Sequence, residues 1–469
     1  MTAPSPAQLL PDVLAEIDAA LPASVDRLFD LLRIPSVSAQ PAHAADCVRA
    51  AEWCRDDLRS LGFAASLRPT EGGPPAVVGH LDAPAGHTGP HILFYGHYDV
   101  QPAEPFDLWT SPPFDPQLID GPRGRRIVAR GAVDDKGQAM MFLEAMRAWK
   151  RATGTIPARV TVLLEGEEEV GSPHLDPFLR AHRADLAADV ALISDTGMWD
   201  IETPALTTRL RGMAYTELVL RGAARDLHSG MYGGSALNAV NALAHILGDL
   251  HDEDGRVQVP GFYDGVRDVP EALAAEWQAL GFDESAYLAD IGLSVPVGER
   301  GWPALQRLWS RPSADINGIW GGYAGAGAKT VIPAEAGAKV SFRLVPGQDP
   351  ARVIDGFRRF VEERLPQGAR AEVRSLASSP AIVVSEDSRY VRAGLAALAD
   401  EFGKPARLIG CGASIPVVES LKRELGIDSL LMGFGLDDDQ PHSPNEKFEL
   451  ACFHRGIRAH ARLLAQLAA

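Results

Sequence analysis

The sequence has only four cysteines among 469 residues, so we do not expect disulfides to stabilise the fold. Cys47 and Cys54 lie seven residues apart on one expected helix, which separates them by about 10 Å, too far for a disulfide. We therefore expect the cysteines to be buried free thiols.

We also expect neither a membrane span nor a secretion signal. The best span candidate, residues 228–248, contains four Gly, two Asn and two His, and is too polar for lipid. The first Lys or Arg is Arg27, and Pro and Asp interrupt the residues before it, so the basic and apolar regions of a signal peptide are missing. We expect a cytoplasmic protein.

Basic residues are fewer than acidic residues in this sequence. The chain has 45 Lys and Arg against 62 Asp and Glu, a formal net charge of −17. This excess opposes non-specific binding to nucleic acid and to anionic membranes. With 46% hydrophobic residues the chain can bury a sizeable core, and its length favours two or three domains over one large domain with insertions.

Two common enzyme signatures are absent. The Gly-rich stretch 321–327 is followed by Lys329 and Thr330, as in a phosphate-binding loop. Ala328 interrupts that pattern, however, and the chain continues as Val-Ile-Pro instead of entering a helix. No Gly-x-Ser-x-Gly nucleophile elbow occurs either. Nucleotide hydrolysis and the commonest serine-hydrolase design are therefore disfavoured.

Helical patterns and short apolar runs alternate along the first part of the chain. The spacing predicts helices at Ser24–Leu32, with Ser24 as N-cap, at Ala44–Leu61 and at Gly137–Lys150. Strands are expected at the apolar runs His91–Tyr95, Arg159–Leu164, Val190–Ser194 and Ser429–Phe434. This order predicts an α/β fold with a doubly wound, mainly parallel sheet.

The middle of the chain has a different pattern. Alternating strands are expected at Ala214–Leu220 and Ala338–Val345, with an uncharged helix at Leu237–Leu247. An apolar run and an acidic loop like those of the first section return after about residue 388. We therefore expect residues 1–207 and 388–469 to form one α/β domain, into which an α+β domain, residues 208–387, is inserted.

Side chains that can bind a metal follow four of the expected strands. In chain order they are His97 and Asp99; Glu165, Glu167, Glu168 and Glu169; Asp195; and Asp437, Asp438, Asp439 and His442. In open α/β sheets the ligand crevice lies beyond the carboxyl ends of the strands, so these groups are expected to meet. Mixed His and carboxylate ligands suit zinc, manganese or cobalt better than calcium or magnesium.

Each group alone has a simpler interpretation. A His-x-Asp pair after a strand is more often an ordinary loop pair, and the run Glu167–Glu169 suits a solvated helix start. The three aspartates Asp437–Asp439 are assigned to a surface loop with no role. Joint occurrence at four strand ends favours a metal site, because four unrelated coincidences would otherwise have to align.

Eight segments, in order along nearly the whole chain, resemble the M20 family of dinuclear zinc peptidases. They are GHYDVQP (96–102), ARGAVDDKGQ (129–138), EGEEEVGS (165–172), SDT (194–196), DLHSGMYGG (226–234), KTVIP (329–333), FRLVPGQ (342–348) and PHSPNE (441–446). The resemblance is strongest to the cytosolic dipeptidase and carnosinase-like branch. It implies a catalytic domain interrupted by a lid and dimerisation domain, and two divalent ions per subunit, with zinc expected and manganese or cobalt as alternatives.

The resemblance also implies roles for individual residues of the first domain. Asp134 bridges the two ions; the first is completed by His97 and Asp195, and the second by Glu169 and His442. Asp99 orients the His97 imidazole and increases its basicity. Glu168 is the general base, which takes a proton from a metal-bridging water and passes it to the leaving amine.

In the middle domain, the resemblance implies that His228 reaches the oxyanion of the partner subunit in a homodimer. Taken alone, His228 is a loop residue before a Ser-Gly turn. Arg343 shares a strand face with Lys339 and Ser341, where arginines are usually just solvated, but its match to the family motif implies that it holds a substrate carboxylate. Weaker substrate-binding candidates are Asn317, Thr330 and Ser414, the last in a CGAS loop that departs slightly from the family's Gly-Gly-Ser form.

The function expected is metal-dependent hydrolysis of dipeptides or short peptides with a free C-terminal carboxylate. Two alternatives remain open. An N-acyl-amino-acid amidohydrolase would use the same metals and arginine with a different acyl pocket. A non-catalytic binding or scaffold module is disfavoured, because all five expected metal ligands and Glu168 are retained.

Overall fold

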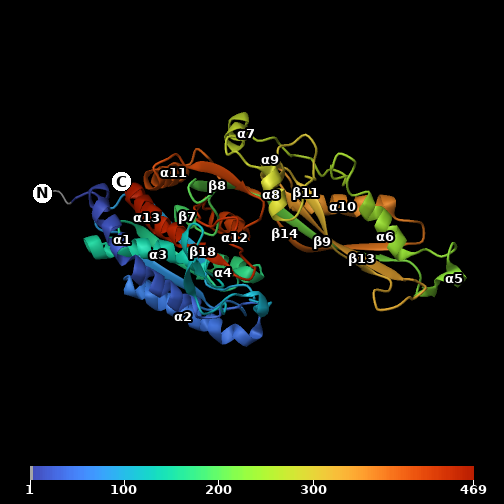
Figure 1. The fold of residues 1–469 in the computed structure, drawn as a ribbon, viewed down its shortest axis with the longest axis horizontal. Coiled ribbons are helices and arrows are strands. Elements are labelled where there is room, and N and C mark those ends of the chain that lie inside the picture. The colour runs from blue at the N-terminus through green and yellow to red at the C-terminus, as the bar shows by residue number, and fades with distance from the viewer. Residues whose placement is uncertain (1–3, 469) are drawn as a thin grey trace. The chain divides into compact units, whose positions relative to one another are not determined.

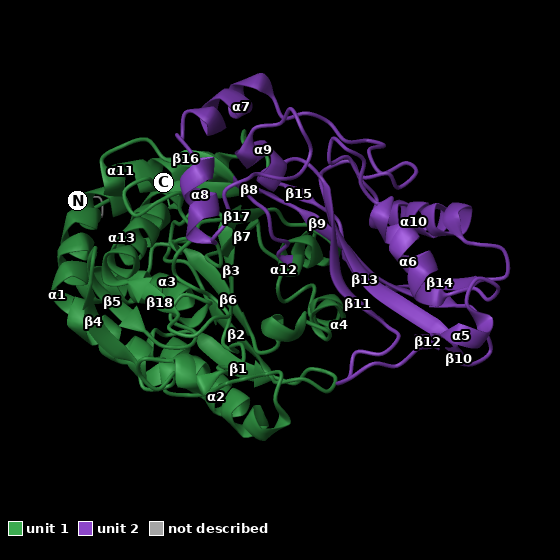
Figure 2. Cartoon of the chain, turned by 45° about the vertical axis from the view of Figure 1, so that its right-hand side comes forward, with its two compact units in different colours: residues 1–208, 384–409, 416–469 green, residues 209–383, 410–415 purple. Residues whose placement is uncertain are grey.

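The computed structural model describes residues 4–468, which form two compact units (Figure 1, Figure 2). Unit 1 consists of the described residues up to 208, together with 384–409 and those from 416 onward. Unit 2 consists of residues 209–383 and the short loop 410–415. The chain therefore leaves unit 1 and returns to it twice. No helix among residues 4–468 is both long and apolar enough to cross a membrane.

Unit 1 contains the mainly parallel sheet predicted from the sequence. The strands follow the order β1-β2-β6-β3-β7-β17 and continue into β8. Strand β3 pairs in parallel with β6 and β7, and β7 with β17, whereas β1 and β2 add an antiparallel edge. The bounds are β1 (Ala64–Arg68), β2 (Ala76–Leu81), β3 (His91–His97), β6 (Arg159–Glu165), β7 (Val190–Ile193), β8 (Ala205–Leu210) and β17 (Ser429–Leu431).

Further elements of unit 1 pack around this sheet. Helices α1, α3 and α13 pack against one another, and α11 packs on α13. A small sheet has the order β18-β5-β4. The bounds are α1 (Pro6–Leu32), α2 (Ala44–Ser60), α3 (Lys136–Thr153), α4 (Leu175–Ala181), α11 (Arg389–Phe402), α12 (Pro416–Ser420), α13 (Leu450–Leu467), β4 (Gln117–Gly121), β5 (Gly124–Val128), β16 (Arg407–Cys411) and β18 (Lys447–Glu449).

The prediction that Ser24 begins a helix is wrong. Helix α1 already begins at Pro6, and Pro22 lies inside it. Burial of Val13 and Ile17 in the core beside α3 and α13 stabilises the first turns and outweighs the cost of the two internal prolines, Pro11 and Pro22. The Ser24 hydroxyl instead donates to Glu144 Oε2 at 2.6 Å, which joins α1 to α3.

Unit 2 is an antiparallel sheet in the order β11-β13-β9-β14, with α6 and α10 packed on it. On β13, Ala338, Val340 and Phe342 are buried, whereas Lys339 is exposed, as the alternation predicted. The bounds are β9 (Gly212–Arg221), β10 (Leu227–His228), β11 (Ser313–Gly321), β12 (Val331–Ile332), β13 (Glu335–Leu344), β14 (Arg370–Ser379), β15 (Ile382–Val383), α5 (Ser229–Tyr232), α6 (Ala239–Gly248), α7 (Glu271–Gln278), α8 (Glu284–Asp290), α9 (Ala304–Trp309) and α10 (Pro350–Arg364).

Candidate metal centre

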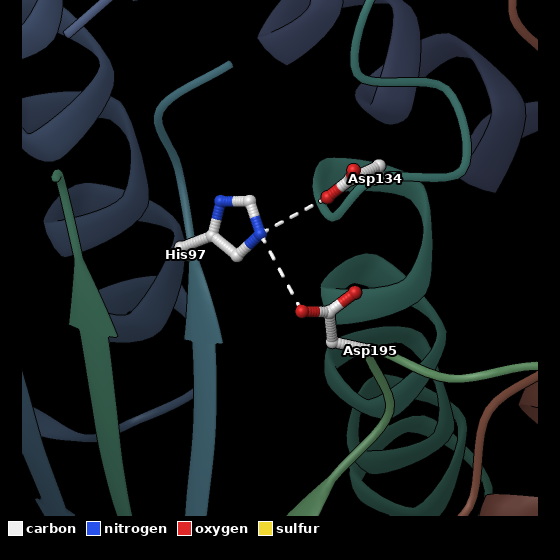
Figure 3. A group of neighbouring side chains, drawn as sticks. All are labelled: His97, Asp134 and Asp195. Atoms are coloured by element: carbon white, nitrogen blue, oxygen red, sulfur yellow. Dashed lines mark ion pairs between the residues drawn. The ribbon is translucent and has the colours of Figure 1, made fainter. Parts of the chain in front are cut away.

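The carboxylate of Asp134 lies between two histidines. Its Oδ1 is 3.2 Å from Nε2 of His97, the last residue of β3, and its Oδ2 is 2.9 Å from Nε2 of His442. Asp195, which follows β7, extends the first side, with Oδ2 3.8 Å from His97 Nε2 (Figure 3). Glu169 extends the second side, with Oε2 3.2 Å from His442 Nε2. Two potential ligand sets therefore share one carboxylate.

Sheet topology explains why residues so far apart in sequence meet here. Strands β3 and β7 are parallel neighbours, so His97 and Asp195 emerge at the same edge of the sheet. His442 comes from a loop after β17 and has a left-handed backbone, with φ +62°, which is uncommon for a residue other than glycine. This conformation belongs to the loop that places its ring against Asp134.

Asp99 fixes the loop after β6 as well as the first histidine. His97 Nδ1 lies 3.1 Å from the backbone carbonyl of Asp99 and 3.4 Å from its Oδ1. The buried Asp99 carboxylate also accepts the backbone N–H groups of Glu168 and Glu169, each at 3.2 Å, and the Ser38 hydroxyl at 2.6 Å. One side chain thus positions residues on both sides of the centre.

Gln101 positions Glu169, a contact that sequence reasoning missed. Its backbone N–H donates to Glu169 Oε1 at 3.1 Å, and its Nε2 donates to Oε2 at 2.9 Å. The glutamine stands in the GHYDVQP segment, so the motif carried a signal. A motif alone does not say which carboxylate its glutamine contacts.

Glu446 plays the corresponding part for Asp134, and it was missed as well. Its Oε1 accepts the backbone N–H groups of Val133 and Asp134, at 2.9 and 3.1 Å. Its Oε2 accepts from Gly131 N at 2.9 Å and from Arg130 Nη1 at 2.8 Å. The carboxylate is fully buried and surrounded by donors, so it fixes the loop that carries Asp134.

A Glu446→Gln variant is expected to bind divalent metal about 10- to 100-fold more weakly. The glutamine NH2 group would face backbone N–H donors that the carboxylate accepts, so those hydrogen bonds would be lost and the Asp134 loop would no longer be held in place. Metal titration followed by elemental analysis measures this loss. Glu144→Gln is the matched control, since Glu144 is also buried but is held by Ser24, Arg27 and Arg147. Equal metal affinity in both variants would contradict the positioning role.

The electrostatics of the centre favour a bound cation. Burial, together with the neighbouring Asp134 and Asp135, raises the pKa of Asp195 well above its usual range. Burial also raises the pKa of Glu168 to about 7, with Glu169 and Asp134 adding to the shift and His97 opposing it. His97 Nε2 is buried and has no hydrogen-bond partner of good geometry among the described residues. Crowded carboxylates around an unsatisfied imidazole nitrogen fit a divalent cation.

A cavity of about 320 Å³ adjoins Asp134 and Asp195 within unit 1. Its other walls include Gly197 and Gly435, which pair as a β-bridge, and Pro441. This volume lies at the small end of ligand pockets.

The assignment of Asp437–Asp439 to a surface loop without a role is wrong for Asp439. This side chain is 1% exposed, accepts the backbone N–H of Leu436 at 2.7 Å and pairs with Lys447 Nζ at 2.5 Å. The loop buries Asp439, the third of the three aspartates. A run of three aspartates does not indicate which of the side chains will be buried.

In unit 2 the expected substrate-binding residues fall into two groups. Arg343 Nη1 donates to Ser414 Oγ at 3.3 Å, so these two lie together. His228 pairs across strands with Val331, next to Thr330, and its Nδ1 accepts the backbone N–H of Gly230 at 3.0 Å. Asn317 joins neither group: it is exposed at an irregularity in the pairing of β11 with β13.

The two groups lie at opposite ends of the unit 2 sheet. Arg343 is at the carboxyl end of β13, about 26 Å along the strand from Glu335 at its start. His228 lies beyond that start, because its partner strand β12 precedes β13. Both views place α5, which begins at Ser229, at one end of the unit 2 sheet (Figure 1, Figure 2).

Comparison with known proteins gives consistent results. The chain matches the description "Peptidase family M20/M25/M40" over residues 93–466. It is 30% identical to the Cys-Gly metallodipeptidase DUG1 of Candida albicans, covering 97% of this chain and 96% of that protein. It is 28% identical to the human Beta-Ala-His dipeptidase, covering 99% and 94%. The crystal structure of human carnosine dipeptidase 1 matches with a TM-score of 0.83 at 28% identity, covering 98% and 99%.

Proposed function

Since the chain belongs to peptidase family M20/M25/M40, and is therefore a metallopeptidase, we propose that it hydrolyses dipeptides with a free C-terminal carboxylate. The observation that carries this proposal is the Asp134 carboxylate held between His97 and His442. The named activities of the relatives, on Cys-Gly and on Beta-Ala-His, support the substrate class.

His97, Asp134 and Asp195 would hold one divalent ion, and Asp134, Glu169 and His442 a second. Zinc is our proposal for both, with manganese or cobalt as alternatives, since imidazole and carboxylate ligands suit all three. Such ions lower the pKa of water and polarise the scissile carbonyl.

Glu168 is the proposed general base. Asp99 holds the Glu168 backbone N–H at 3.2 Å, which fixes its place beside the ligand Glu169. From there the carboxylate accepts a proton from the attacking water and returns it to the amine that leaves. The neighbouring Glu167 has a different task, because its Oε1 already accepts from the His174 backbone N–H at 2.9 Å.

Arg343 and Ser414 are proposed to bind the substrate carboxylate, and His228 to stabilise the oxyanion from the partner subunit of a homodimer. A dipeptide spans roughly 7 Å. Two groups separated by most of the β13 strand cannot both reach it from one chain, so either His228 serves another subunit's site or it serves none. Thr330 accompanies His228 in this arrangement.

The edge of the unit 2 sheet supports a homodimer. Strand β11 is an edge strand, and it exposes Ile316, Ile319 and Trp320 by 40%, 63% and 38%. Apolar side chains along an unpaired strand edge favour association. We accordingly propose that residues 208–387 form the lid and dimerisation domain, and that residues 1–207 and 388–469 form the catalytic domain.

A substrate panel tests the proposed function. We expect the metal-loaded enzyme to cleave dipeptides, including Cys-Gly and β-alanyl-histidine, at least about 10-fold faster in kcat/KM than N-acetyl amino acids, because a pocket discriminates between acyl groups by 1–3 kcal/mol. Preference for the acetylated set would assign an N-acyl-amino-acid amidohydrolase instead. If the metal-loaded enzyme hydrolysed neither set of substrates, the result would favour the alternative of a non-catalytic binding or scaffold module.

A further inference from the structure

A second guanidinium lies beside Arg343 in unit 2. Arg211, between β8 and β9, is half-buried, and its pKa is lowered to about 10 by burial and by the neighbouring Arg343 cation. Its Nε donates to the Gly412 carbonyl at 2.9 Å, and Arg343 donates to Ser414 in the same loop. Two cations therefore converge on residues 410–415.

This pair has no counter-charge of its own. Among residues 4–468, no carboxylate forms an ion pair with Arg211 or Arg343. In the same unit, each of four other arginines pairs with a carboxylate: Arg221, Arg256, Arg311 and Arg364. The charge of Asp315 acts to raise the pKa of Arg211, but the Asp315 carboxylate lies beyond ion-pair distance from the guanidinium. Like charges held together away from water cost free energy that a bound anion recovers.

The backbone of the loop is shaped for this approach. A side chain at Gly412 would place its Cβ 3.1 Å from Arg211 Nη2 and 3.1 Å from the Leu308 carbonyl, closer than ordinary van der Waals contact, so glycine at this position eases the approach of the loop to Arg211. Ala413, which stands where the family's Gly-Gly-Ser form has its second glycine, is exposed. The departure from Gly-Gly-Ser thus leaves the contact intact.

We propose that Arg211 is a second guanidinium of the carboxylate-binding site, and that it and Arg343 together bind the C-terminal carboxylate of the substrate. This inference rests on the proposed peptidase function, and it identifies a specificity residue that the sequence analysis did not name. Two forked cations and the Ser414 hydroxyl around one carboxylate would favour peptide acids over uncharged peptide amides.

The test compares Arg211→Met with wild type on the best dipeptide of the panel and on its C-terminal amide. We expect KM for the acid to rise about 10- to 100-fold, the value of a charged hydrogen bond, with kcat changed less than about threefold. Activity on the amide should stay within about threefold of wild type. Arg211→Lys, which keeps the charge, should recover part of the loss.

Lys339→Met is the matched control. Lys339 is an exposed cation on the same face of β13 as Arg343, so its loss removes equal charge without touching the loop. We expect wild-type KM for both substrates.

Three results would overturn the inference. They are an unchanged KM for the acid in Arg211→Met, an equal loss on acid and amide, and an equal effect of Lys339→Met. Equal loss on both substrates would leave Arg211 only the structural task of holding the Gly412 carbonyl. Failure of the proposed function is distinct, because wild type itself would then cleave no dipeptide.

Discussion

A Glu168→Gln variant is expected to lose about 10²- to 10⁴-fold in kcat on the dipeptide that wild type cleaves fastest. Glutamine keeps the size of the side chain but cannot accept the proton of the attacking water. The Glu168 backbone N–H would still be held by Asp99, so the fold and the metal ligands should be unaffected. Steady-state kinetics measure the loss, and elemental analysis should find the wild-type metal content.

Two comparison variants make this result specific. Glu167→Gln changes the adjacent carboxylate, which binds His174, and should alter kcat by less than about 10-fold. Asp134→Asn weakens the group that both histidines contact, and should lose metal and activity together. A larger kcat loss in Glu167→Gln than in Glu168→Gln would move the general base to Glu167.

The second large effect concerns His228. His228→Ala is expected to lower kcat about 10²- to 10³-fold, the usual cost of removing an oxyanion donor. The side chain is exposed, and among the described residues its ring forms a hydrogen bond with the Gly230 backbone N–H alone, so the variant should fold normally. Thermal unfolding should confirm an unchanged midpoint.

Mixing two inactive variants tests whether His228 acts across a dimer. Subunit exchange between His228→Ala and Glu168→Gln should restore about a quarter of wild-type activity, since half of the dimers are mixed and each has one intact site. Each variant incubated alone is the control. No restoration, in a mixture shown by mass spectrometry to contain heterodimers, would rule out action in trans.

The sequence predicted the architecture of unit 1 well because its strands are nearly continuous apolar runs, as in β3 and β6. Such runs predict buried parallel strands directly. The predicted start of α1 at Ser24 was wrong. The capping preference of Ser24 can be read from the local sequence, whereas the burial of Val13 and Ile17 depends on tertiary packing. Local propensity is a weak prior that tertiary packing overrides.

For the candidate centre, the residue types and their order along the chain were determined by the sequence alone. His97, Asp134 and His442 stand in segments that resemble one family, and the match over residues 93–466 confirms that resemblance. Their convergence follows from a general property of parallel sheets, whose carboxyl ends share one edge.

Only the tertiary structure decided which groups touch. Glu446 and Gln101 lie in quoted motifs, yet their contacts with the Asp134 loop and with Glu169 depend on the three-dimensional path of three separate segments. Arg211 lies in none of the quoted motifs, and it is close to Arg343 because β9 and β13 are neighbouring strands. Sequence records the chemistry of each side chain, whereas distance and burial, which set the strength of charge and hydrogen-bond interactions, exist only after the chain has folded.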